Sequence, residues 1–170
     1  SVITNAVSGE IIDLWHSYGV RVISTRTVGY EHVDYRRAAE LGIVVSNVSY
    51  TPHTVAEYTV MTILMAIRRM KTILIRYMGQ DYSLDGIRGR ELCNMTVGVV
   101  GTGRIGEMDI RNLSGFGCRI LACSPTEKES VKTHAEYVDL DTLWRRCDLI
   151  TFHVPATEET FHMVNREALR

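Results

Sequence analysis

A glycine-rich segment near the middle of the chain constrains its fold more than any other feature. Gly101-Thr-Gly103-Arg-Ile-Gly106 matches the pattern G-x-G-x-x-G. An apolar stretch typical of a strand, Thr96–Val100, precedes it, and residues 105–116 have the apolar periodicity of a helix. In this context Gly101 allows a tight turn, Gly103 leaves room for a pyrophosphate against bare backbone, and Gly106 lets helix and strand approach closely. The segment predicts a dinucleotide-binding turn, with the phosphates at the N-terminus of the helix.

Strand and helix patterns alternate along the rest of the chain. Such alternation favours parallel pairing and an α/β fold in which helices cover the sheet. The strand expected at residues 20–24 is interpreted as buried. In the second part of the chain we predict the first half of a Rossmann-like doubly wound parallel sheet. Helices are expected at residues 10–18, 33–41, 53–77, 105–116 and 140–146, and strands at residues 20–24, 43–45, 96–100, 119–123 and 149–152.

The longest expected helix, at residues 53–77, follows Pro52, which suits the first turn of a helix. Its apolar residues surround most of its circumference instead of forming one stripe. A helix of this kind is normally buried on more than one side, between domains or against another subunit.

Composition and charge argue against several classes of function. The 170 residues carry a formal net charge of -1, so no basic surface points to nucleic acid. No apolar run is long enough to cross a bilayer, and no secretory leader is visible after Ser1. The four cysteines show neither metal-ligand spacing nor a dense disulfide pattern, so we expect no metal site and a reducing, cytoplasmic location. Both ends read as abrupt, which predicts a piece of a longer protein.

Together with the glycine motif, five segments resemble the D-2-hydroxyacid dehydrogenases in their order and spacing. Within this family the chain is most similar to the D-lactate dehydrogenase branch, which includes the vancomycin-resistance type. The five segments are Ser24-Thr-Arg-Thr-Val-Gly-Tyr-Glu-His-Val-Asp34, Leu41-Gly-Ile43, Tyr50-Thr-Pro-His-Thr-Val-Ala-Glu-Tyr58, Arg88-Gly-Arg-Glu-Leu92 and Phe152-His-Val-Pro155.

The resemblance implies an organisation and an activity. Residues 1–50 would be the end of a flavodoxin-like substrate-binding domain, and residues 51–170 the N-terminal half of an NAD-binding Rossmann domain. The whole protein would use NADH to reduce a pyruvate-like 2-oxoacid to a D-lactate-like D-2-hydroxyacid. It would form a homodimer through the helix at residues 52–77.

The resemblance also assigns site residues position by position. The backbone N–H groups of Val28 and Gly29 would hold the substrate carboxylate, and Tyr50 would lie near the substrate. An ordinary turn and a core aromatic residue are the alternative interpretations of these positions. The other matched positions would contact the cofactor: Gly101, Gly103, Arg104, Ile105, Gly106, Ser124, Val154, Pro155 and Thr160.

Ser124, at the end of the second strand of the expected Rossmann sheet, leaves the choice of cofactor open. An acidic residue at this position binds the ribose 2′-OH of NAD. A serine has no carboxylate to repel the 2′-phosphate of NADP, yet the first basic residue that follows is Lys128. The resemblance favours NAD, with NADP as the alternative.

The acid–base residues of the family match no position in the chain. In the family an arginine polarises the 2-oxoacid and a histidine, oriented by a glutamate, donates the proton; all three lie downstream of residue 170, so we assign no catalytic residue. His153, at the end of a strand, is interpreted as structural or supporting. Two alternatives to a dehydrogenase stay open: a non-catalytic dinucleotide-binding module and an inactive truncated product.

Asp109 is a second departure from the family pattern. It occupies a position on the cofactor helix where a small or apolar residue would face the sheet. An unpaired buried carboxylate is costly. We therefore expect a rotated helix, a partner for Asp109, or a relaxed constraint on this position.

Overall fold

The computed structural model describes residues 5–168, which divide into two compact units. The first unit contains residues 5–51 and 155–158, and the second contains residues 52–154 and 159–168. Each unit has a hydrophobic core of its own.

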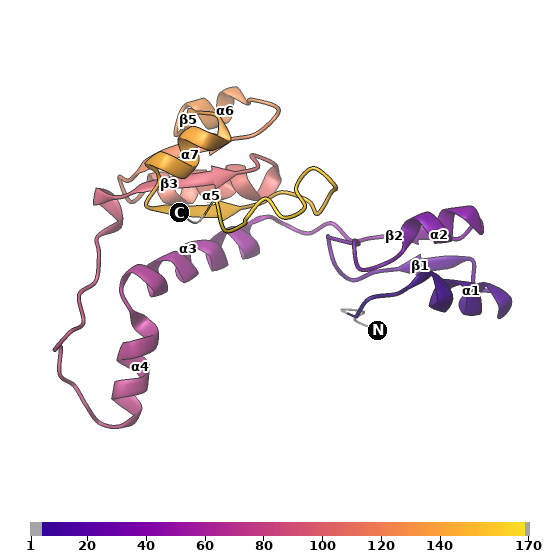
Figure 1. Cartoon of the computed structure of the whole chain (residues 1–170), viewed down its shortest axis with the longest axis horizontal. Helices are drawn as coiled ribbons and strands as arrows, with labels where there is room; N and C mark the ends of the chain where they lie inside the picture. Colours follow the sequence, from indigo (N-terminus) through magenta and orange to yellow (C-terminus); the bar gives the residue numbers. More distant parts are fainter. Residues whose placement is uncertain (1–4, 169–170) are drawn as a thin grey trace. The chain divides into compact units, whose positions relative to one another are not determined.

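The first unit is a small α/β arrangement whose elements are labelled in Figure 1. Its apolar core packs the two helices against the two strands, which pair in parallel. The elements are α1 (Gly9–Ser17), β1 (Val22–Ser24), α2 (Tyr35–Glu40) and β2 (Val44–Ser46). The core residues are Val7, Ile12, Ile23, Val33, Ala38 and Ile43.

The prediction that the first strand is buried is wrong in part. Ile23 is 5% exposed, but Val22 is 61% exposed, and so is Val44, its partner in the register of the two strands. Successive side chains of a strand point to opposite faces. One face of this two-stranded sheet is therefore open among the described residues, while the other carries the core.

The second unit is built on a four-stranded sheet in which all strands are parallel. The strand order is β5-β4-β3-β6, so β3 lies between the strand that follows it in the chain and the last strand of the sheet. This is the order of the first four strands of a Rossmann fold, and it confirms the predicted α/β class and doubly wound sheet. The strands are β3 (Thr96–Val100), β4 (Arg119–Cys123), β5 (Glu136–Tyr137) and β6 (Leu149–Phe152).

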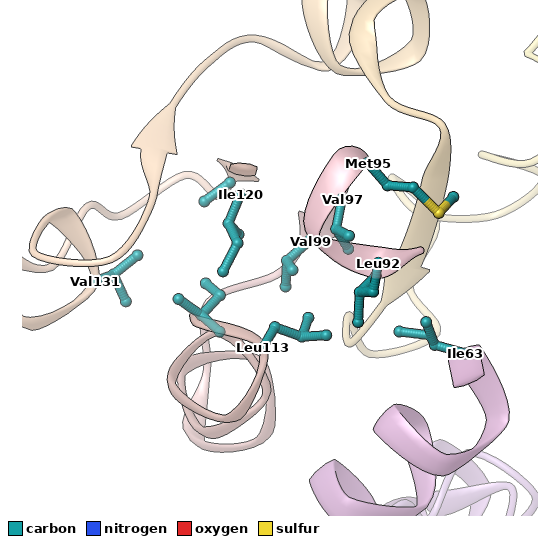
Figure 2. Close-up of a cluster of buried hydrophobic side chains, with 10 residues drawn as sticks. Ile63, Leu92, Met95, Val97, Val99, Leu113, Ile120 and Val131 are labelled. Atoms are coloured by element: carbon teal, nitrogen blue, oxygen red, sulfur yellow. The ribbon is translucent and has the colours of Figure 1, made fainter. Parts of the chain in front are cut away.

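Helices cover both faces of this sheet. On one face Val97 and Val99 of β3 belong to the same buried core as Leu113 of α5 (Arg104–Ser114), which Figure 2 shows in close-up. On the opposite face, a Cβ atom added to Gly98 would meet Leu143 of α7 (Leu140–Arg146) at 2.7 Å. The sheet is thus enclosed as a doubly wound fold requires. Two short helices that the sequence did not reveal complete the unit: the 3-10 helix η1 (Leu92–Asn94) and α6 (Glu129–Lys132).

The long helix predicted at residues 53–77 is wrong, because two helices occupy this segment. They are α3 (His53–Ile67) and α4 (Met70–Met78), separated by Arg68 and Arg69; the φ of Arg69, +53°, lies in the left-handed region. At the end of α3, a residue distant in the sequence supplies a hydrogen bond: the backbone N–H of Arg90 donates to the carbonyl oxygen of Ile67 at 2.9 Å. The connector that follows α4 therefore supplies a hydrogen bond at the point where α3 ends.

None of the helices within residues 5–168 combines the length and the apolar character needed to cross a membrane. In the same range, no three His, Cys, Asp or Glu side chains come together as a metal-ligand group.

Candidate functional site

The glycine turn lies where the winding of the sheet changes direction. Gly101 follows β3 directly, and its backbone N–H donates to the carbonyl oxygen of Cys123, at the end of β4, at 2.8 Å. On its other side, a Cβ atom on Gly101 would lie 2.7 Å from the carbonyl oxygen of His153, which follows β6. The turn therefore sits between the carboxyl ends of β4 and β6, which is the switch point where open α/β sheets bind ligands.

The structure requires glycine at two of the three motif positions, for a different reason at each, and leaves the third position open. Gly101 has a φ of +90°, a conformation that side chains with a Cβ rarely adopt. A Cβ atom on Gly106 would collide with the carbonyl oxygen of Gly101, because the first turn of α5 rests directly on the glycine turn. Gly103 is exposed, and a Cβ atom there would meet nothing within 4 Å. Among the described residues no packing contact requires glycine at position 103, and the space beside it is open.

The N-terminus of α5 faces this open space. Gly103 is its N-cap residue and contributes no side-chain hydrogen bond to the helix. The first N–H groups of a helix have no partner within the helix, and together with the helix dipole they favour an anion. A pyrophosphate approaching over Gly103 would meet these N–H groups.

Two side chains that sequence reasoning missed hold the turn in place. Thr102 is buried, and its hydroxyl lies 2.9 Å from the hydroxyl of Tyr137 in β5. The same Tyr137 hydroxyl accepts a hydrogen bond from the backbone N–H of Lys128 at 3.2 Å. Tyr137 thus ties the glycine turn to the loop that follows β4. The only sequence signal was an aromatic residue in a strand of two residues, which is too short to recognise.

An ion pair connects the same loop to α5. The Lys128 ammonium lies 2.8 Å from one carboxylate oxygen of Glu107, and the hydroxyl of Ser130 donates to the other oxygen at 2.6 Å. The hydrogen bond from Lys128, followed by the one from Ser130, lowers the pKa of Glu107. The Glu107 carboxylate is therefore ionised at neutral pH. Half-buried Ser124, the expected ribose contact, lies at the start of this loop.

Asp109 has a partner, which settles the question that the sequence raised. Its side chain is fully buried on α5, and one oxygen lies 3.2 Å from Nε2 of His153. The Thr151 hydroxyl lies 3.1 Å from the same nitrogen. The second oxygen of Asp109 has no hydrogen-bond partner among the described residues. His153 thus joins the cofactor helix to the end of β6, and the geometry gives it a structural task.

The residues that the resemblance assigns to the substrate lie in the first unit. Val28 and Tyr50 are 38% and 47% exposed. The Asn47 side chain donates to the carbonyl oxygen of Val28 at 2.6 Å, and the Thr27 hydroxyl donates to that of Gly29 at 2.6 Å. These hydrogen bonds fix the direction of the peptide groups in the loop.

The expected cofactor residues fall mainly in the second unit. Gly101, Gly103, Arg104, Ile105 and Gly106 form the turn and the start of α5, and Ser124 ends the neighbouring strand. A Cβ atom on Gly101 would meet Cγ1 of Val154 at 2.9 Å, so Val154 lies beside the turn. Thr160 belongs to the same unit, whereas Pro155 belongs to the first unit.

Known proteins resemble the chain along nearly its whole length. Residues 60–170 match the family described as D-isomer specific 2-hydroxyacid dehydrogenase, NAD binding domain. A D-specific alpha-keto acid dehydrogenase of Enterococcus faecium is 42% identical over 164 residues, which cover 96% of this chain and 50% of that protein. D-lactate dehydrogenase kk1H of Curvularia clavata is 40% identical over 162 residues, which cover 95% of this chain and 47% of that protein.

Solved structures agree with this relationship. The apo-structure of D-lactate dehydrogenase from Escherichia coli has a TM-score of 0.85 and 35% identity, over 98% of this chain and 54% of that one. D-lactate dehydrogenase from Aquifex aeolicus, complexed with NAD and lactic acid, has a TM-score of 0.87 and 35% identity, over 99% of this chain and 51% of that one. The chain spans about half the length of these relatives. It belongs to the family of D-isomer specific 2-hydroxyacid dehydrogenases, to whose NAD-binding domain its residues 60–170 correspond.

Proposed function

We propose that this protein binds NAD at the glycine turn and uses it to reduce a pyruvate-like 2-oxoacid to a D-lactate-like D-2-hydroxyacid. The observation that carries the proposal is the exposed Gly103 at the N-terminus of α5, between the carboxyl ends of β4 and β6. Relatives named for D-lactate and alpha-keto acid dehydrogenases support the reaction class. The bound cofactor would supply the hydride.

The protein's own residues would bind and orient the two reactants. The N–H groups at the start of α5, with Arg104 and Ile105, would hold the pyrophosphate, and the Ser124 hydroxyl would bind the adenosine ribose. Val154, Pro155 and Thr160 would line the cofactor after β6. The peptide N–H groups of Val28 and Gly29 would hold the substrate carboxylate, with Tyr50 beside it, which would make the first unit the end of the substrate-binding domain.

The exposed side of α3 and α4 supports a homodimer formed through this helical segment. α4 has no buried residue, and its apolar side chains Ile75 and Met78 are 61% and 85% exposed. Tyr58 of α3 is 65% exposed. Exposed apolar residues gathered on adjacent helices are typical of a subunit interface.

The cysteines support a reducing, cytoplasmic location. All four are free thiols, and burial raises the pKa of Cys118, Cys123 and Cys147, the last to about 11. Such thiols are unreactive, as expected for structural cysteines in a reducing compartment.

A calorimetric titration with NADH tests the proposal. We expect the purified protein to bind NADH, and a Gly103→Val variant to bind at least about tenfold more weakly, because the new side chain fills the pyrophosphate space. The fold of this variant should be intact, since the position is open, and its thermal unfolding midpoint provides the control. Binding of NADH that Gly103→Val leaves unchanged would contradict the proposed site.

An activity assay tests whether these 170 residues include a proton donor. A purified chain of these 170 residues alone should bind NADH without oxidising it in the presence of pyruvate, because the acid–base residues of the family match none of its positions. NADH oxidation that depends on pyruvate would overturn that assignment and place the proton donor among the present residues.

A further inference from the structure

The loop after β4 carries one cation, Lys128, four positions after Ser124, the expected ribose contact. Residues 124–131 read Ser-Pro-Thr-Glu-Lys-Glu-Ser-Val, so Lys128 is the only basic residue of this segment. Its backbone N–H binds the Tyr137 hydroxyl, which lies 2.9 Å from Thr102 in the glycine turn. Lys128 is therefore held next to the dinucleotide turn.

The Lys128 ammonium is already occupied. Glu107 binds it at 2.8 Å, and Ser130 holds the second carboxylate oxygen of Glu107 at 2.6 Å. The two side chains are each 37% exposed, so the pair is only partly screened by water. Glu107 lies in the first turn of α5, where the helix dipole favours its negative charge.

The consequence for cofactor choice is electrostatic. The 2′-phosphate of NADP adds a charge of about -1.5 to -2 near the ribose, as for other phosphate monoesters. Ser124 provides no charge to reject it. Glu107 contributes a negative charge beside the turn and at the same time neutralises the cation that would attract the phosphate.

We infer that Glu107 is a specificity-determining residue, which favours NAD over NADP by holding the Lys128 ammonium away from the 2′-phosphate position. The inference rests on the proposed binding of a dinucleotide at the glycine turn. It extends that proposal, because it places the determinant of cofactor choice on α5 and not at the end of β4, where an acidic residue binds the ribose in NAD-binding domains.

Calorimetric titrations with NAD+ and NADP+ test the inference through the ratio of the two dissociation constants. In Glu107→Gln the freed Lys128 should bind the 2′-phosphate, and the Kd of NADP+ relative to that of NAD+ should fall at least about fivefold. The double variant Glu107→Gln/Lys128→Gln should return the ratio to within about twofold of the original value, because the cation is gone.

Glu127→Gln is the matched control. It removes the same charge one residue away from Lys128, but Glu127 pairs with Lys132 at 3.0 Å and not with Lys128. Its ratio should stay within about twofold of the original value, whereas a shift as large as that of Glu107→Gln would indicate a general charge effect. A thermal unfolding midpoint for each variant shows that its fold is intact.

The outcomes separate this inference from the proposed function. If the original protein binds NAD+ but Glu107→Gln leaves the ratio unchanged, Glu107 is not the determinant and the proposed function stands. If the relative gain in NADP+ affinity persists in the double variant, a group other than Lys128 attracts the phosphate and the inference is wrong. If the original protein binds neither NAD+ nor NADP+, both the proposed function and the inference fall.

Discussion

The two parallel sheets of the molecule differ in how completely they are covered. In the first unit Val22 and Val44 stand side by side in the register, each 61% exposed, while in the second unit Val97 and Val99 are fully buried. Helices α5 and α7 lie on opposite faces of the second sheet, whereas the core of the first unit lies on one face of its two strands. A β-branched residue in a strand is therefore a poor measure of burial here, because the covering helices decide it.

The largest expected loss of stability concerns the close contact between α5, which covers one face of the second sheet, and the glycine turn. Gly106→Ala should lower the free energy of unfolding by about 3 kcal/mol, because the new methyl group collides with the Gly101 carbonyl. Gly115→Ala, at the other end of α5, is the matched control, since Gly115 has right-handed helical angles and its Cβ would lie 3.4 Å from the nearest atom. It should change stability by less than about 0.5 kcal/mol in urea denaturation. Equal effects would show that α5 does not rest on the turn.

A comparable loss of stability should follow from breaking the buried Asp109–His153 pair, which links α5 to the end of β6. His153→Leu leaves the Asp109 carboxylate buried without a partner, and we expect a loss of about 3 kcal/mol. Asp109→Val/His153→Leu removes the carboxyl group as well, so the double variant should be more stable than His153→Leu alone. A double-mutant cycle in urea measures the coupling. A double variant as unstable as the sum of the single variants would contradict the pairing.

A smaller effect tests the comparison of the two sheets directly. Val97→Ala should cost about 2 kcal/mol, because it opens a cavity in the core shown in Figure 2. Val44→Ala should cost less than about 0.5 kcal/mol, because the side chain is largely in water. Tryptophan fluorescence distinguishes the units, since Trp15 packs in the first core and Trp144 lies against Phe152 in the second unit. A large loss of stability in Val44→Ala would mean that this face of the sheet is covered.

Sequence patterns anticipated the parts of the fold that depend on local residues. β3, the glycine turn, α5 and β4 follow one another within about 30 residues, and each was recognised within one or two positions. The break between α3 and α4 was missed because its hydrogen bond comes from Arg90, far along the chain from Ile67. A continuous apolar pattern cannot show a contact of that kind.

The candidate site also contains residues that local sequence patterns predict and residues that depend on contacts between distant parts of the chain. The glycines and Ser124 could be proposed from the sequence because their spacing is fixed by the turn and the strand that follows. The Glu107–Lys128 pair and the Thr102–Tyr137 hydrogen bond join residues 21 and 35 positions apart, so they appear only when the loop folds over α5. Asp109 was recognised as an anomaly, but its partner His153, 44 positions away, required the register of β6 beside β3.

Hydrogen exchange with and without NADH, followed by mass spectrometry, locates a bound dinucleotide along the chain and so tests whether it binds at the glycine turn. We predict the largest slowing at the amides of residues 102–106, at the glycine turn and the first turn of α5, with a smaller effect in the loop at residues 124–128. The strands β1 and β2 should change least. If NADH binds but the exchange of residues 102–106 is unchanged, or the largest slowing falls on β1 and β2, the assignment of the glycine turn as the dinucleotide site is wrong.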